Sequence, residues 1–318
     1  MKLQKKELKN YTSQQTWEKV VSFFPASNQI SKTVFPEESF VEWKNGVIHL
    51  DQYLKDKAPA RVIMLHGVGG NGRILSFMAV PLFNRGFEVI CPDLPGYGYT
   101  KTTSKNITFQ GWIEAVNHII ETVSANDHRP IFLFGFSLGG TLAYHVATLN
   151  HKVKGIIATC MLDQRVKEVR DYSAINKTMS RIGPAVLKLF NTLTPGFMLP
   201  MKMVANTGAI VNDPNVLSIL LKDRTSSGVR VPVRFLHSVI NAKPKVEPND
   251  FDHCPVSLLH PEKDKWTPVE ISRIFFDRIK GEKEIRILEN AGHFPLEQPG
   301  ITQLEEYTAE FLQKHCST

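Results

Sequence analysis

A serine lies at the centre of Gly135-Phe136-Ser137-Leu138-Gly139, which has the form G-x-S-x-G. The apolar residues before it predict a buried strand, and the residues after it predict a helix. A serine on such a sharp strand-to-helix turn projects its hydroxyl above the sheet, and the glycines beside it avoid clashes with neighbouring backbone. We therefore expect Ser137 to be the nucleophile of an acyl-transfer reaction. The alternative is a chance match in a surface loop.

Two later residues could serve as the base that activates this hydroxyl and the acid that orients the base. Asp264 follows a predicted strand and precedes a predicted helix, and His293 lies in N-A-G-H-F-P after the next predicted strand. The order Ser, Asp, His is the one expected when a G-x-S-x-G turn carries the nucleophile. Glu262 and Asp163 are alternatives for the acid.

A glycine-rich loop, His66-Gly67-Val68-Gly69-Gly70, follows an early predicted strand. In this arrangement the loop supplies backbone N–H groups that stabilise the oxyanion of a tetrahedral intermediate. We expect the N–H groups of Val68 and Leu138 to do so. His66 itself is expected to be a buried hydrogen-bonding residue and not a catalyst.

The same loop also fits a different pattern. Gly67 to Gly72 reads G-x-G-x-x-G, and Asp93 follows about twenty residues later, as in dinucleotide-binding sites. A nucleotide-dependent oxidoreductase is therefore the second hypothesis. This oxidoreductase hypothesis assigns no role to the G-x-S-x-G turn, Asp264 or His293.

The elements that must position these residues alternate along the chain. Short apolar runs predict strands buried on both faces, with helical patterns between them. This alternation predicts an α/β fold with a mostly parallel, doubly wound sheet. The strands are expected at residues 61–66, 87–91, 130–134, 153–159, 255–259 and 284–288, and the helices at 71–83, 108–123, 138–149, 268–279 and 303–315.

The part of the chain before this alternation has a different pattern. Residues 1–30 are expected to be helical and amphipathic around Trp17 and Phe24. A hairpin turn is expected at Asn45-Gly46, because this dipeptide favours tight turns between strands. The short strands predicted around it are residues 32–35, 40–43 and 46–50.

Residues 162–252 interrupt the alternation and predict an inserted, mainly helical cap, so that residues 31–161 and 253–318 form the core. The centre of the insert is apolar and rich in methionine, which adapts to varied ligands. We expect an acyl chain to bind there. The candidate substrate-binding residues, two of which lie beside the predicted catalytic residues, are Phe136, Phe190, Phe197, Met198, Met201 and Trp266.

The composition limits the classes of partner. The 318 residues carry a formal net charge of +7, spread along the chain without a nucleic-acid-binding motif, so nucleic-acid binding is not expected. The four cysteines form no CxxC pair, and there is no signal peptide pattern or long apolar segment. We therefore expect a cytoplasmic protein without stable membrane insertion. The histidines lack metal-binding spacing, so neither a metal nor a cofactor is expected. The oligomeric state is left open.

Together these motifs resemble the α/β-hydrolase superfamily, from Arg61 to the C-terminus: H-G-V-G-G, D-L-P-G-Y-G-Y-T, G-F-S-L-G-G, H-P-E-K-D-K-W-T-P and N-A-G-H-F-P. The chain looks most like the monoacylglycerol-lipase and lysophospholipase-like group, or like the acyl-homoserine-lactone hydrolases of quorum quenching. The resemblance implies a serine esterase, lipase or lactonase acting on a small acyl ester or lactone with an apolar acyl chain. A non-catalytic ligand receptor on the same fold is the third hypothesis.

Overall fold

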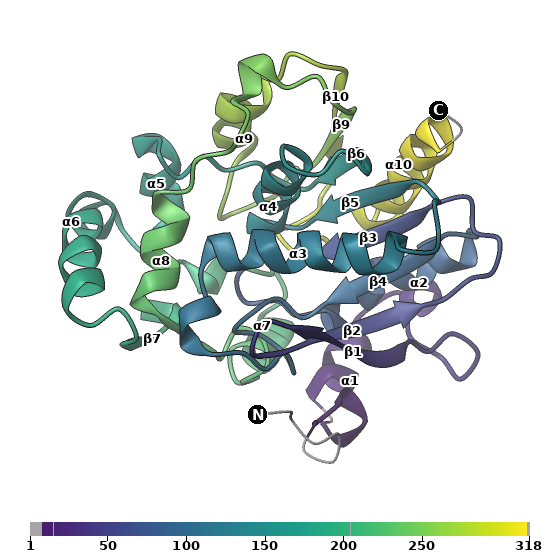
Figure 1. The fold of residues 1–318 in the computed structure, drawn as a ribbon, viewed down its shortest axis with the longest axis horizontal. Helices are drawn as coiled ribbons and strands as arrows, with labels where there is room; N and C mark the ends of the chain where they lie inside the picture. Colours follow the sequence, from purple (N-terminus) through teal and green to yellow (C-terminus); the bar gives the residue numbers. More distant parts are fainter. Residues whose placement is uncertain (1–7, 15, 204, 317–318) are drawn as a thin grey trace.

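An eight-stranded sheet forms the centre of the molecule in the computed structural model, which describes residues 8–14, 16–203 and 205–316 (Figure 1). The strand order is β1-β2-β4-β3-β5-β6-β9-β10, and from β4 to β10 all neighbouring strands are parallel. The predicted α/β class with a mostly parallel sheet is confirmed. The strands are β1 (Glu37–Trp43), β2 (Gly46–Tyr53), β3 (Arg61–Leu65), β4 (Glu88–Pro92), β5 (Ile131–Gly135), β6 (Val153–Ala158), β9 (Val256–Pro261) and β10 (Lys283–Leu288).

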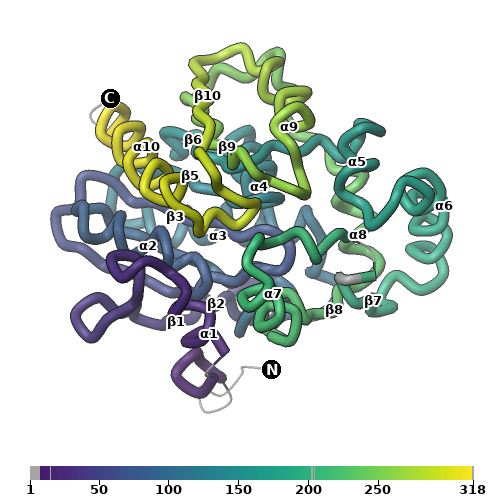
Figure 2. The backbone as a smooth tube through the Cα atoms, turned by 180° about the vertical axis from the view of Figure 1, so that it is seen from behind, coloured from purple at the N-terminus to yellow at the C-terminus, as the bar shows by residue number. Residues whose placement is uncertain are grey.

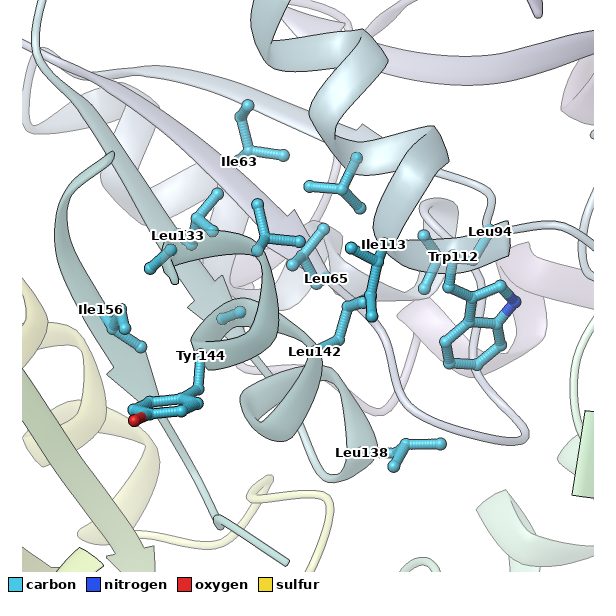
Figure 3. Close-up of a cluster of buried hydrophobic side chains, with 14 of the residues drawn as sticks. Ile63, Leu65, Leu94, Trp112, Ile113, Leu133, Leu138, Leu142, Tyr144 and Ile156 are labelled. Carbon is cyan, nitrogen blue, oxygen red and sulfur yellow. The ribbon is translucent and has the colours of Figure 1, made fainter. Parts of the chain in front are cut away.

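Helices cover both faces of this sheet because the residues of its central strands are apolar on both sides. In β3, Ile63 and Leu65 pack with α3 (Phe109–Ser124) and α4 (Leu138–Ala147) on one face, where Figure 3 shows Trp112, Ile113 and Leu142 beside them. Val62 and Met64 point to the other face, which is covered by α2 (Ser76–Asn84) and α10 (Gly300–His315) (Figure 2). The two-residue period of a strand thus divides the core into two layers.

The antiparallel hairpin of β1 and β2 differs in two details from the prediction. Its turn is Lys44-Asn45, one residue earlier than predicted, because Gly46 already pairs with Trp43. Gly46 is needed there for space, since a Cβ would lie 2.0 Å from the carbonyl oxygen of Lys101. Residues 32–35 form no strand: the Ser31 hydroxyl accepts hydrogen bonds from the N–H groups of the following turn, which competes with strand pairing.

The N-terminal segment packs on the α2 side of the sheet as short helical turns. These are a 3₁₀ turn at Tyr11–Ser13, α1 (Thr16–Val21) and a 3₁₀ turn at Ala26–Asn28. Both Trp17 and Phe24 are buried: Phe24 packs against Phe77 of α2, and the guanidinium of Arg73 lies over the ring of Trp17. Residues 1–7 and 15 of the predicted helical stretch lie outside the described residues.

The segment between β6 and β9 extends the molecule to one side, at the left of Figure 1. It contains α5 (Lys167–Ser173), α6 (Lys177–Leu193), α7 (Pro214–Leu220) and α8 (Val233–Ile240). It also contains a small antiparallel pair, β7 (Met198–Pro200) and β8 (Arg230–Pro232), which the sequence did not predict. Each strand is too short to show an alternating pattern, and each ends in proline. The division into core and cap at residues 162 and 252 stays a prediction. α9 (Val269–Phe276) follows β9.

Candidate active site

Ser137 lies on a tight turn between β5 and α4. Its φ angle is 54°, in the left-handed region that a serine rarely adopts, so the surrounding backbone must hold it there. Glycines allow this close packing: a Cβ at Gly135 would lie 2.1 Å from the carbonyl oxygen of Gly139, and a Cβ at Gly139 would lie 2.2 Å from that of Leu65. The backbone N–H of Ser137 donates to the hydroxyl of Thr159. The sequence motif therefore forms the strained turn expected of it.

Asp264 and His293 meet above the carboxyl ends of β9 and β10, although they are far apart in the sequence. The Nδ1 atom of His293 lies 2.7 Å from Oδ2 of Asp264. The other carboxylate oxygen accepts hydrogen bonds from the backbone N–H groups of Trp266 and Thr267, both at 2.8 Å. The Thr267 hydroxyl donates to Oδ2 of Asp264, at 2.7 Å. This set of contacts fixes both the acid and the orientation of the imidazole.

The surroundings keep Asp264 ionised. Burial by itself raises the pKa of its carboxyl group, but the charge and hydrogen bond of His293 and the hydrogen bonds of Thr267 lower it to about 2. The Nε2 atom of His293 is buried and has no hydrogen-bond partner among the residues that the structure describes. A buried nitrogen of this kind is available to a substrate or nucleophile.

The two alternative acids lie elsewhere. Glu262 is partly exposed and accepts a hydrogen bond from the backbone N–H of Asn290. Asp163 forms an ion pair with Arg165, at 2.7 Å. The structure therefore brings Asp264, and neither of these carboxylates, to His293.

The glycine-rich loop after β3 packs directly against Ser137. A Cβ at Gly67 would lie 2.7 Å from Cβ of Ser137 and 3.1 Å from the backbone nitrogen of Leu138. Within the described part of the chain, neither Val68 N–H nor Leu138 N–H donates to a backbone acceptor. His66 is buried and accepts from the N–H of Leu94, which confirms it as a buried hydrogen-bonding residue. Burial lowers its pKa to about 4.

Asp93 holds the far end of this loop. Its carboxylate accepts hydrogen bonds from the backbone N–H groups of Gly72 and Tyr99 and from the Tyr11 hydroxyl, and it lies 3.0 Å from Nδ1 of His49. The side chain is fully buried and its acceptors are occupied. It cannot receive a ribose hydroxyl, which is the role that the dinucleotide hypothesis assigned to it.

A buried ionic cluster adjoins Asp93. Within it, Glu38, His49 and Asp51 place possible metal-ligating atoms within 4.8 Å of one another. The guanidinium of Arg73 already pairs with the carboxylates of Asp51 and Glu38. Burial by itself lowers the pKa of His49, but the charge and hydrogen bond of Asp93, with Glu38 and Asp51, raise it to about 10. Two cations therefore compensate these acids, and the cluster acts as a structural network.

A cavity of about 350 Å³ opens beside Ser137, a size typical of small-molecule sites. Its base contains Ser137, Leu138 and Thr267, and its walls come mainly from α5, α6 and α8. The walls are mostly apolar. Phe190 and Phe197 line the cavity and are 42% and 52% exposed, so the cavity is continuous with the outer surface of the segment between β6 and β9.

Most of the predicted substrate-binding residues line this cavity. Phe190, Phe197, Met201 and Trp266 do so, whereas Met198 does not. The reason is the alternation of side chains along β7, in which Leu199 faces the cavity and its neighbours point away.

Phe136 belongs to a second, smaller cavity. This cavity measures about 50 Å³ and is also lined by Val68, Ser137, His293 and Phe294. Ser137 and Val68 line both cavities, so Ser137 lies where a large and a small space meet.

A family model described as "Serine aminopeptidase, S33" matches residues 56–299, which is most of the chain. The chain belongs to this family. It is therefore a hydrolase, for which a serine nucleophile is typical, and the oxidoreductase hypothesis is wrong. The N-terminal residues before 56, including Tyr11, Glu38 and His49 of the ionic cluster, lie outside the family match.

Similar proteins include lipid-ester hydrolases. The thermostable monoacylglycerol lipase of Bacillus sp. (strain H-257) is 23% identical over 267 residues, covering 84% of this chain and 95% of that protein. A soluble variant of monoglyceride lipase from Saccharomyces cerevisiae, solved with a substrate analogue, has a TM-score of 0.74 at 18% identity and covers 92% of this chain and 98% of its own. An N-acyl homoserine lactonase complexed with N-butanoyl homoserine has a TM-score of 0.61 at 16% identity. The match covers 89% of this chain and 98% of the lactonase. These two structures establish the α/β-hydrolase fold.

No helix within residues 8–14, 16–203 and 205–316 has both the length and the apolar character that a membrane span requires.

Two parts of the site were not predicted from the sequence. They are Thr267, whose hydroxyl binds Asp264, and the cavity wall from α8. The α8 signal was present, because Val233, Leu236 and Ile240 recur at helical spacing and all line the cavity.

The insert also contacts both loops that carry the site. The hydroxyl of Ser227 donates to the carbonyl oxygen of Gly69, at 2.8 Å. The backbone N–H of Phe294 donates to the carbonyl oxygen of Ile210, at 3.0 Å. The glycine-rich loop and the His293 loop are thus each tied to residues between β6 and β9.

Proposed function

We propose that this hydrolase is a serine carboxylic-ester hydrolase. His293 takes the proton of Ser137, and the Ser137 oxygen attacks the ester or lactone carbonyl while the N–H groups of Val68 and Leu138 stabilise the oxyanion. His293 then returns the proton to the leaving alcohol. Water hydrolyses the acyl-enzyme, releasing the acid and restoring the Ser137 hydroxyl, while Asp264 keeps His293 in the required tautomer.

The observation that carries this proposal is the Asp264–His293 pair. Nδ1 of His293 is held by an ionised, buried carboxylate, and its unpartnered Nε2 belongs to a residue that lines the same small cavity as Ser137. A base with one nitrogen oriented and the other available, next to a serine on a strained turn, is the geometry that nucleophilic catalysis needs.

The two cavities suggest how the substrate is divided. The leaving alcohol must receive a proton from His293, and His293 lines only the cavity of about 50 Å³. We therefore assign a small leaving group to that space and the acyl chain to the apolar cavity of about 350 Å³. A medium to long acyl chain on a small alcohol, as in a monoacylglycerol, fits this division best. A lysophospholipid-type ester has a larger headgroup, and the alkoxide that leaves in an acyl-homoserine lactone stays in the same molecule, so these two are the less direct candidates.

An aminopeptidase activity, which the family description includes, is less compatible with the cavity. An aminopeptidase must bind the charged amino group of its substrate, for which a carboxylate is the usual partner. Among the described residues, no Asp or Glu lines either cavity. The apolar walls favour an acyl chain.

Covalent labelling combined with an ester panel tests the proposal. A fluorophosphonate should label Ser137, as mapped on the digested protein, and Ser137→Ala should not be labelled. The wild type should hydrolyse monoacylglycerols, acyl-homoserine lactones or simple esters, with higher kcat/KM for octanoyl than for acetyl esters. Ser137→Ala should lose several orders of magnitude in rate. Absence of labelling and of turnover would favour a non-catalytic ligand receptor and refute the proposal.

A further inference from the structure

One charged side chain lies in the wall of the large cavity. Arg170, on α5, is the only Asp, Glu, Lys, Arg or His among the described residues that line it. The neighbouring polar residues of the wall are Gln164, Ser173 and Ser180. A single cation in an otherwise apolar site is the kind of group that selects a ligand by charge.

The contacts of Arg170 leave part of its guanidinium without a partner. Its Nη1 donates to the carbonyl oxygens of Gln164 and Arg165, at 2.9 and 2.7 Å. Its Nε is buried without a hydrogen-bond partner, and no carboxylate of the described chain pairs with it. The contrast with Arg165 is direct, because Arg165 pairs with both Asp163 and Glu247.

The other donors of the wall are already engaged. The hydroxyls of Ser173, Ser180 and Thr267 each donate to an acceptor of the chain itself. Arg170 is therefore the cationic donor of the wall whose charge the described protein does not compensate.

A cation beside apolar walls is unfavourable unless an opposite charge pairs with it. The Nη2 group of Arg170 donates to no acceptor of the described chain. A guanidinium N–H pairs strongly with a carboxylate oxygen. We propose that the large cavity binds acyl chains that carry a second carboxylate, and that Arg170 binds this carboxylate. The preferred substrates are then half-esters of dicarboxylic acids with a small alcohol.

This inference rests on the proposed function, because it assigns the acyl chain to the large cavity. It adds a specificity that an apolar pocket alone does not provide. In a purely apolar cavity, a terminal carboxylate would weaken binding, since its desolvation would not be compensated. The effect of Arg170 should therefore appear as a difference between substrates that share the same chain.

The experiment compares methyl octanoate, monomethyl octanedioate and dimethyl octanedioate, with the released acid measured by chromatography. The variants are Arg170→Gln, which removes the charge, and Arg170→Lys, which keeps the charge but not the planar guanidinium. Arg181→Gln, at an exposed position of α6, is the matched control. Thermal unfolding of every variant shows whether the fold is retained.

We expect Arg170→Gln to lower kcat/KM for the half-ester about thirtyfold, as for loss of a charge-assisted hydrogen bond, and to change the two uncharged esters less than about threefold. Arg170→Lys should restore part of the loss, and Arg181→Gln should match the wild type. Equal losses on all three esters, or rejection of the half-ester by a wild type that hydrolyses methyl octanoate, would overturn the proposal.

A binding measurement separates this proposal from the proposed function. Octanedioate should bind Ser137→Ala in calorimetry more tightly than octanoate, and Arg170→Gln in that background should remove the difference. If the wild type hydrolyses no ester but this Arg170-dependent binding is present, the hydrolytic function fails and the carboxylate site stands. If Arg170 does not affect octanedioate binding, the carboxylate site is refuted.

Discussion

The candidate site has two halves that differ in residue type: a core half from the loops after the sheet strands, and a cap half from the segment between β6 and β9. The core half consists of Ser137, Asp264 and His293, which follow parallel strands of the sheet and are held by short hydrogen bonds and a strained turn. The cap half is mostly apolar, and several of its side chains are exposed as well as lining the cavity; Phe190 is one of them. The core half therefore has the rigidity that the proposed catalysis requires, and the cap half has the adaptable surface that the proposed acyl substrates require.

Charges follow the same division. In the core, Arg73 and His49 are fully buried, and each is paired with carboxylates. In the cap wall, Arg170 has no carboxylate partner in the described chain. Buried pairs stabilise a structure only when every partner is present, whereas an uncompensated cation in a cavity is available to a ligand. Arg73 and His49 thus hold the fold, whereas Arg170 is the charge proposed to select a substrate.

The largest expected effect concerns the core half. Asp264→Asn should lower kcat for ester hydrolysis by about ten-thousandfold, because an amide favours the wrong tautomer of the histidine. Rates on a soluble ester measure this directly. Glu262→Gln, on the same loop but with its carboxylate directed to Asn290, is the matched control and should stay close to the wild type. Similar losses in both variants would show that the loop, and not the Asp264–His293 contact, determines the rate.

The second effect concerns the ionic cluster, and it is a dependence of the unfolding free energy on pH. His49 has its pKa raised from the ordinary 6.5 to about 10, so between these values the folded protein keeps a proton that the unfolded chain releases. The contribution of His49 to the free energy of unfolding is complete below pH 6.5 and is lost as the pH rises towards 10. The free energy of unfolding then falls by at most about 1.4 kcal/mol per pH unit for this one proton. Denaturant unfolding at pH 7, 8 and 9 should show this decrease.

The matched variants for this prediction are His49→Gln and His128→Gln. The first removes the titrating group and should flatten the decrease in unfolding free energy, even if its stability is lower throughout. The second changes an exposed histidine and should keep the wild-type slope. An unchanged slope in His49→Gln would contradict the assignment of the proton to His49.

The smallest effect concerns the cap half. Phe190→Ala should lower kcat/KM for an octanoyl ester about five- to tenfold, because a partly exposed aromatic wall contributes only part of a buried contact, and it should barely affect an acetyl ester. Leu193→Ala on the same helix is the control, since Leu193 is 70% exposed and does not line the cavity. An equal effect of Phe190→Ala on both esters would place the acyl chain elsewhere.

Much of the core could be predicted because its signals are local. The runs that became β3 and β5 are apolar on both faces, and the glycines of the Ser137 turn stand where a Cβ would clash with backbone. The cap was less predictable, because β7 and β8 are short strands whose pairing depends on residues far apart in the chain. The position of Met198 outside the cavity follows from that pairing, and no local pattern contains it.

What the sequence alone determined is the order of the elements and the residue types that they carry: a serine on a glycine-flanked turn, a later aspartate and a later histidine. Tertiary structure decided which carboxylate meets His293, because Asp264 and Glu262 lie on one loop and only the packing of β9 beside β10 directs Asp264 to the imidazole. It also decided that Arg170 stands in a cavity wall and that Asp93 is enclosed by Tyr11 and His49. Both depend on contacts between distant segments, which form only when the chain is folded.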